Sequence, residues 1–289
     1  MYQHPGRKQE AECAAKMIRG RLEQAEHLAA RDDRRWIGLV LGTGWGDALT
    51  LHDSIQIPFS EIPGFEALGE LAGHRRVLEI GYIDAEHAKP PVAVLRGRVH
   101  MNEDPLDPAV PKMVRLQIAM LCELGTRRFV LTCAAGSLES SISVGHLAVM
   151  KSFVMFGNEI MPLWGGEFAS PEDVLEPSWV RTACEAAMAA EIAVVYEGVA
   201  HAYVRGPHFE GRSNDKGNLA KLGAHTVGMS VKPECCIAGL YGARAVGVAF
   251  ITNDAIETHD HETNVARAKA SSAKLGAFLE RVVTTLPQA

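Results

Sequence analysis

The chain contains no apolar run that approaches the roughly 20 residues needed to span a bilayer. Its N-terminal stretch, MYQHPGRKQEAECAAK, is polar and has no apolar core of the kind found in signal peptides. The six cysteines form no C-x-x-C pair, which is typical of reduced and mostly buried thiols. Together these absences predict a cytoplasmic protein with no membrane partner.

The chain also has no excess of basic residues over acidic ones. The 35 acidic residues outnumber the 29 lysines and arginines, which gives a formal net charge of -6. A surface that binds nucleic acid is normally basic, so this balance argues against a nucleic-acid partner. The hydrophobic share of 47% and the charged share of 22% are ordinary for a globular protein.

Apolar runs alternate with helical patterns along the 289 residues, and no repeat or low-complexity linker interrupts them. This alternation predicts one α/β domain, residues 1–289, with a central mixed β-sheet flanked by helices. Residues 1–34 are expected to be an N-terminal helical segment and residues 35–289 the core. Strands are expected at 36–42, 74–83, 91–98, 128–136, 146–156 and 244–252, and a long strand or a hairpin is expected at 193–206. Helices are expected at 10–30, 110–125 with Gly125 as the C-cap, 171–190, 214–224 and 232–243, and one long helix is expected to end the chain.

The stretch GTGWG places Gly42, Gly44 and Gly46 directly after an apolar run, where glycine-rich loops often cradle phosphate groups. The dinucleotide fingerprint needs G-x-G-x-x-G and a helix that begins inside it. Here the spacing is G-x-G-x-G and the following residues show no helical period. No Gly-Lys-Ser/Thr follows, so the P-loop is excluded too. The hydroxyl of Thr43, backed by backbone N–H groups, can still bind a small oxyanion, with a plain tight turn as the alternative.

Polar or small-residue turns directly follow several expected strands, and in open α/β sheets ligands bind outside the carboxyl ends of strands. In the turn GRVHMNED, Arg98 and His100 stand at positions i and i+2, which face the same way in an extended segment. A guanidinium beside an imidazole makes an anion site. Taken singly, these residues also fit packing or turn chemistry, as a surface arginine and a core histidine.

The blocks GTGWGD, GHRR, GRVHMNE, TCAAGSL, GPHFE, LGAHTVGMSVKPE, ITND and HETNVARA occur in this order over roughly residues 35–285. This order resembles the trimeric purine nucleoside phosphorylase family, and GPHFE and LGAHTVGMSVKPE are its most specific pieces. The resemblance implies a nucleoside phosphorylase-like fold, a catalytic core at 35–289, a homotrimer and a role in purine salvage.

The resemblance also implies a role for each residue that matches a family motif. The expected phosphate ligands are Thr43, His74, Arg98, His100, Ala134 through its backbone, and Ser230. The expected nucleoside-binding residues are Phe209, Glu210, Val227, Met229, Asn253, His261, Asn102 and, from a neighbouring subunit, Phe168. The segment GFEALGELAGHRR, which contains His74, is expected to be a lid over the phosphate.

The implied reaction is reversible phosphorolysis of a purine (deoxy)ribonucleoside to the free base and (deoxy)ribose 1-phosphate. Inorganic phosphate is the co-substrate, and no cofactor or metal is implied. Asn253, Glu210 and His100 are the expected catalytic residues, because preorganised groups that face developing charge are usually the largest catalytic contribution. Glu210 can accept a hydrogen bond from purine N1–H, which favours 6-oxopurine nucleosides such as inosine and guanosine.

The chain departs from the family pattern at several positions, two of which match residues at the expected ribose and phosphate contacts. Asn102 replaces a tyrosine that contacts the ribose, and Cys133 replaces an asparagine beside the phosphate turn. Three alternatives therefore stay open: a 5′-methylthioadenosine phosphorylase, a purine or phosphate sensor without turnover, and a metal site formed by His259, Asp260, His261 and Glu262.

Overall fold

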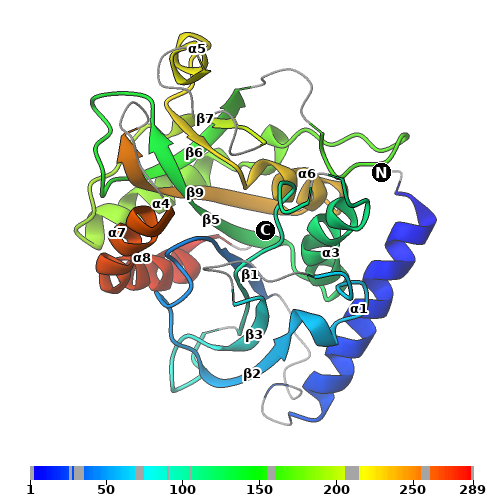
Figure 1. Ribbon diagram of the computed structural model, residues 1–289. Coiled ribbons are helices and arrows are strands. Elements are labelled where there is room, and N and C mark those ends of the chain that lie inside the picture. The colour runs from blue at the N-terminus through cyan, green and yellow to red at the C-terminus, as the bar shows by residue number, and fades with distance from the viewer. Residues whose placement is uncertain are drawn as a thin grey trace.

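The computed structural model describes residues 3–25, 28, 36–68, 75–89, 91–104, 106–154, 160–205, 215–254 and 261–287. The described chain forms an α/β fold with a central mixed β-sheet flanked by helices, as the sequence predicts (Figure 1).

One nine-stranded sheet, in the order β2-β3-β4-β1-β5-β8-β7-β6-β9, organises the fold. Strand β9 also pairs with β5, so that the five strands from β5 to β9 close on themselves while β1 to β4 extend the sheet to one side. The strands are β1 (Ile37–Leu41), β2 (His52–Pro58), β3 (Val77–Tyr82), β4 (Val92–Arg96), β5 (Arg128–Ser137), β6 (Leu147–Val154), β7 (Val199–Tyr203), β8 (Thr226–Gly228) and β9 (Arg244–Asp254).

Two layers of helices cover the sheet. Helices α1 (Pro5–Glu23), α3 (Ala109–Glu123) and α6 (Lys232–Leu240) pack on one side, and α4 (Pro177–Ala189), α7 (His261–Ala270) and α8 (Ser272–Thr285) lie on the other (Figure 1). The short helix α5 (Asp215–Lys221) lies near β7 and β8, and single 3-10 turns occupy Phe59–Glu61 and Glu172–Val174.

The alternation of side chains along the buried strands explains both layers. In β1, Leu39 and Leu41 face the core beneath α4 and α8, whereas Val40 faces the core beneath α1 and α3. Strands covered on both faces read as continuous apolar runs, which is why WIGLVLG is so easily recognised in the sequence.

Two strands were not expected from the sequence. Strand β2 lies at an edge of the sheet and leaves every residue except Ile57 half-buried or exposed, so that HDSIQIP has no apolar run. Strand β8 has three residues, which is too short for a periodic pattern.

Several expected boundaries were wrong. Helix α1 runs from Pro5 to Glu23 rather than over 10–30. Within the segment 193–206, strand β7 covers five residues. The helix expected at 171–190 begins at Pro177, because proline suits the first turn of a helix. The long final helix is two helices separated at Ser271. The C-cap of α3 is Leu124 rather than Gly125, and Gly125 follows it with φ 105, in the left-handed conformation in which glycine often closes a helix.

All six cysteines are free, and five of them are buried, whereas Cys13 is exposed. Among the residues that the structure describes, no helix is both long and apolar enough to cross a membrane.

Candidate active site

The site forms where strand β5 changes neighbours. Strand β1 pairs with residues 128–131 of β5, and β8 pairs with residues 136–137 on the same side, while β9 pairs along the whole opposite side. No described strand therefore pairs with residues 132–135 on that side. The gap corresponds to the switch point at which open α/β sheets bind ligands.

The backbone of Ala134 faces this gap. Backbone groups of a strand alternate between its two neighbours. On the gap side, the Thr132 carbonyl accepts a hydrogen bond from Arg98, and the Leu138 N–H donates to His225 O at 2.9 Å. Ala134 lies between them in the same alternation. The expected turn at Ala134 is part of β5 rather than a turn, because β9 extends the pairing to Ser137.

The glycine loop after β1 is fastened to the same stretch of β5. The Gly42 N–H donates to Thr132 Oγ1 at 3.1 Å, and the Thr132 hydroxyl donates to Val40 O at 2.9 Å. The Trp45 indole N–H donates to Cys133 O at 3.0 Å. Thr43, held between these contacts, is half-buried at the edge of the gap.

Arg98 is fully buried, so the alternative of a surface arginine is wrong. Its guanidinium donates to the Thr132 carbonyl and to Glu234 Oε1, with which it forms an ion pair. The turn that carries it is rigid, since the buried amide of Gln117 accepts from the Val99 N–H at 2.9 Å and donates to the Val99 carbonyl at 3.1 Å.

His100 and Asn102 follow in the same turn and are half-buried. The backbone N–H of His100 donates to Glu103 Oε1 at 2.7 Å, and the other carboxylate oxygen of Glu103 accepts from Arg76. The Asn102 amide reaches Met229 Sδ at 3.6 Å, so the two expected ribose contacts lie side by side.

Ser230 is buried and directly precedes Val231, whose backbone is strained. Val231 has φ 77 and ψ -48, a region that a β-branched residue almost never adopts. Such a conformation costs about 1–3 kcal/mol and is found mostly at functional sites. It turns the chain sharply from Ser230 into α6, whose first turn carries Glu234.

Asn253 is buried near the carboxyl end of β9, beside a β-bulge. Ala135 pairs with Ile251 and Gly136 with Asn253, so Thr252 is the extra residue, and bulges of this kind re-aim side chains next to active sites. The Thr252 hydroxyl lies 3.0 Å from Asn253 Oδ1, and Asn253 Nδ2 donates to Asp254 O at 3.3 Å. Val227 pairs with Gly136 from the other side, so Val227 and Asn253 share one face.

The structure thus brings most of the expected residues together at the gap in β5. Three of the expected residues, His74, Phe209 and Glu210, lie outside the described residues, as do the His261 side chain and most of the four-residue metal alternative. The described part of the chain contains no cluster of three metal-binding side chains. Phe168 is 82% exposed and is not brought together with the other described residues of the expected site.

Sequence reasoning missed the buried polar residues that hold the site: Thr132, Gln117, Glu234 and His201. His201 is fully buried, with Nδ1 2.9 Å from Thr226 Oγ1, and its ring lies against Gly228, two residues before Ser230. Burial, together with the charge of Lys232, lowers the pKa of His201 to about 3, so the ring is neutral at pH 7. Burial raises the pKa of Cys133 to about 12, so this thiol stays protonated.

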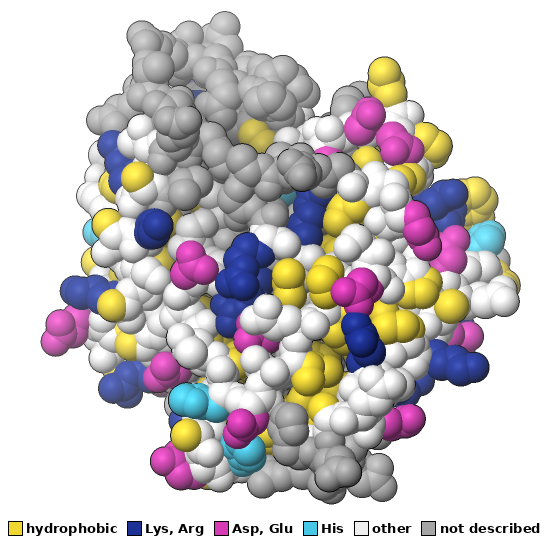
Figure 2. Space-filling model, turned by 60° about the horizontal axis from the view of Figure 1, so that its bottom comes forward, with side chains coloured by type: hydrophobic (Ala, Val, Ile, Leu, Met, Phe, Trp, Pro, Cys, Tyr) yellow, Lys and Arg dark blue, Asp and Glu magenta, His cyan; other side chains and the backbone are white. Residues whose placement is uncertain are grey.

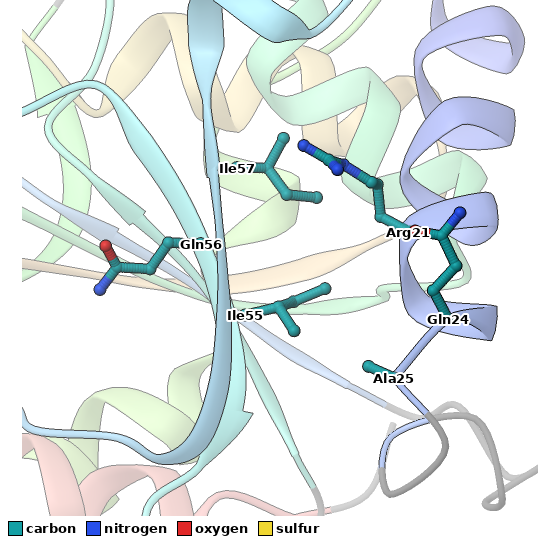
Figure 3. Close-up of a pocket in the computed structure, with 6 residues that line it drawn as sticks. All are labelled: Arg21, Gln24, Ala25, Ile55, Gln56 and Ile57. Carbon is teal, nitrogen blue, oxygen red and sulfur yellow. The ribbon is translucent and has the colours of Figure 1, made fainter.

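A separate cavity of about 360 Å³ lies between the C-terminal turn of α1 and strand β2 (Figure 3). Its lining includes Arg21, Gln24 and Ile55 and none of the expected site residues. On the face shown in Figure 2, Lys and Arg side chains are interspersed with Asp and Glu over the described surface.

The chain is similar to known proteins in sequence and in fold. The model of the phosphorylase superfamily matches residues 37–284. The purine nucleoside phosphorylase of Mycobacterium leprae is 30% identical over 253 residues, which cover 86% of this chain and 88% of that protein. The enzyme of the same name from Cellulomonas sp is 30% identical over 234 residues, which cover 79% and 78%. A Schistosoma mansoni purine nucleoside phosphorylase solved in complex with inosine has the same fold, with a TM-score of 0.77, 22% identity, and coverage of 96% of this chain and 97% of that one.

The chain belongs to the phosphorylase superfamily and, within it, to the purine nucleoside phosphorylase family.

Proposed function

We propose that this chain is a purine nucleoside phosphorylase that exchanges the base of a purine (deoxy)ribonucleoside for inorganic phosphate. The observation that carries the proposal is the convergence of the Thr43 loop, Arg98 and Ala134 on one gap beside β5. Ser230 follows two residues after Gly228, which lies against the Ala134 carbonyl. The Arg98 charge and the hydroxyl and backbone donors around it suit a phosphate anion.

Phosphate held there would attack the anomeric carbon of the sugar. As the glycosidic bond breaks, positive charge grows on the ribose and negative charge on the purine. The anionic oxygens of phosphate stabilise the positive charge on the ribose, and holding phosphate in place makes the step effectively unimolecular. The Asn253 amide is held at its bulge by Thr252 and Asp254, and its second Nδ2 hydrogen would donate to purine N7, where the negative charge collects. His100 and Glu210 are the further catalytic residues of this proposal, and the reaction requires phosphate as co-substrate but no cofactor or metal.

The nucleoside half of the proposal rests on the residues that match the family motifs. Val227 and Met229 would form walls for the base and ribose, and Asn102 adds an amide beside Met229. The family motif gives Phe209 the role of stacking on the purine. His261 binds the ribose 5′-hydroxyl, and His74 closes over the phosphate.

We also propose a cytoplasmic homotrimer that acts in purine salvage. Ile160, Trp164 and Phe168 expose large apolar side chains on one segment, which suits burial against a second copy. Phe168 would then complete the neighbouring active site. Mass measurement in solution tests the trimer, and Phe168→Ala should raise the nucleoside KM without changing that for phosphate.

The experiment that tests the function is a phosphate-dependent assay on inosine, guanosine, xanthosine, adenosine and methylthioadenosine. We expect base release from 6-oxopurine nucleosides at least about tenfold faster than from adenosine, a difference of about 1.4 kcal/mol. Preference for methylthioadenosine would indicate the related phosphorylase, and phosphate binding without turnover would indicate a sensor.

The base-reading role of Asn253 has its own test. Asn253→Asp should shift the preference toward 6-aminopurines, because a carboxylate accepts a hydrogen bond from the exocyclic amine. Measuring inosine and adenosine turnover in both proteins decides it. An equal loss on the two substrates would mean that Asn253 only supports the bulge.

A further inference from the structure

The ion pair between Arg98 and Glu234 differs from a buried pair elsewhere in the molecule. In the pair Arg115–Glu167, both carboxylate oxygens accept from the guanidinium, at 2.5 and 2.7 Å, and each also accepts a backbone N–H, from Trp164 or His4. Glu234 accepts from Arg98 through Oε1 alone. Its Oε2 is buried and has no hydrogen-bond partner among the described residues.

A buried pair that is only partly satisfied contributes little to stability. Removing two charges from water costs several kcal/mol per ion, and the attraction between them offsets this only when the remaining acceptors are also satisfied. Glu167 meets that condition and Glu234 does not. The position of Glu234 therefore requires a reason other than folding.

The surroundings of Glu234 supply that reason. Glu234 lies in the first turn of α6, four residues after Ser230, and it is 2% exposed. The guanidinium it holds is fixed from the other side by the Thr132 carbonyl, beside Gly42. Glu234 thus ties Arg98 to the two segments that the proposed function assigns to phosphate, the Thr43 loop and Ser230.

The geometry points to Glu234 as a positioning residue for phosphate, which holds the Arg98 guanidinium in place and offsets its charge until the anion binds. This inference rests on the proposed function. Phosphate would approach a guanidinium whose charge is partly balanced, so its affinity is set by Glu234 as well as by Arg98. Position and charge are separable, because glutamine keeps the acceptor oxygen and loses the charge, whereas alanine loses both.

The test compares Glu234→Gln, Glu234→Ala and the matched control Glu167→Gln with the wild type. Inorganic phosphate is the probe, and the readouts are its dissociation constant, the shift in Tm that it produces, and the phosphate KM with inosine. We expect Glu234→Gln to lower Tm without phosphate but to bind phosphate about tenfold more tightly, since one negative charge has left the vicinity of Arg98. Glu234→Ala should weaken binding about tenfold, because the guanidinium is released.

Glu167→Gln should lower Tm and leave the phosphate dissociation constant unchanged. If Glu234→Gln behaves like Glu167→Gln, the inference is wrong and Glu234 is only structural. If Glu234→Ala does not fold, the isosteric Glu234→Gln still decides. A wild type that shows neither phosphate binding nor phosphate-dependent turnover would overturn the proposed function instead, so the two failures are distinct.

Discussion

Gly42 is the residue of the glycine loop that lies directly against the backbone of β5 and the Arg98 side chain. The methyl group added by Gly42→Ala would lie 2.7 Å from Arg98 Nη2, 2.7 Å from the Thr132 carbonyl oxygen and 3.0 Å from Cys133 Cα. Real methyl groups do not make contacts as short as 2.7 Å. Two of the three neighbours are backbone atoms of β5, which β9 holds from behind. The Arg98 side chain must therefore move first.

The expected cost follows from these contacts. Overpacking a close-packed site costs about 1–3 kcal/mol. Losing the hydrogen bond from Arg98 to the Thr132 carbonyl costs a further 1.5–3 kcal/mol or so. The free energy of unfolding should therefore fall by about 2.5–6 kcal/mol. Because the displaced guanidinium is the proposed phosphate ligand, the phosphate KM should rise about tenfold in the protein that still folds.

Gly46→Ala is the matched control in the same loop. Nothing lies within 4 Å of the position of its added methyl group, and its φ is not left-handed. Its unfolding free energy should stay within about 0.5 kcal/mol of the wild type. Urea unfolding and phosphate titration of inosine turnover measure both variants. Identical urea midpoints and phosphate KM values for Gly42→Ala and Gly46→Ala would refute the reasoning.

Three further predictions follow from single contacts. Gly44 has φ 80 and its added methyl would lie 2.0 Å from Ala268 Cβ, so Ala268→Gly should restore part of the stability that Gly44→Ala loses, and no rescue in urea unfolding would contradict this. Arg98→Lys should raise the phosphate KM more than the nucleoside KM, because one ammonium cannot reproduce the two-sided guanidinium contacts, and equal changes would count against it. His201, whose pKa burial lowers to about 3, binds a proton in the unfolded chain near pH 6.5 but not in the fold, so its share of stability is present above that pH and is lost as the pH falls toward 3. Between about pH 5.5 and 4.5, the unfolding free energy of the wild type should fall with decreasing pH more steeply than that of His201→Asn, by about 1.4 kcal/mol per pH unit. Parallel profiles of the two proteins would show that the ring titrates normally.

The sequence predicted the elements whose surroundings are uniform. Strands β1, β4 and β5 are buried on both faces, so most of their residues are apolar whatever the direction in which each points. Edge strand β2 and three-residue β8 carry no such pattern, because their residues are fixed by the strands they pair with. The closure of strands β5 to β9 was not predictable either, because it depends on pairing between strands more than a hundred residues apart in the sequence.

The expected ligands and the residues that hold them were predictable to different degrees. Arg98, Ser230 and Asn253, the proposed ligands, were selected from motifs, since ligand contacts require particular residue types at particular turns. Glu234 lies inside one of those motifs but nothing in the sequence distinguishes it from an ordinary acidic residue in the first turn of a helix. Its role depends on a partner 136 residues away.

Burial of Arg98 shows why these two kinds of residue must be considered together. A guanidinium can be enclosed only when its donors find acceptors, since unpaired buried charge costs far more than a single contact returns. The acceptors here are a carbonyl from the middle of β5 and a carboxylate from α6, and neither segment is adjacent to Arg98 in sequence. The fold must therefore assemble β5 and α6 before Arg98 has a defined position. It follows that a motif identifies the side chain that would contact phosphate, whereas the affinity of that contact is set by Thr132 and Glu234, at which substitutions can change phosphate binding while the turn that carries Arg98 stays intact.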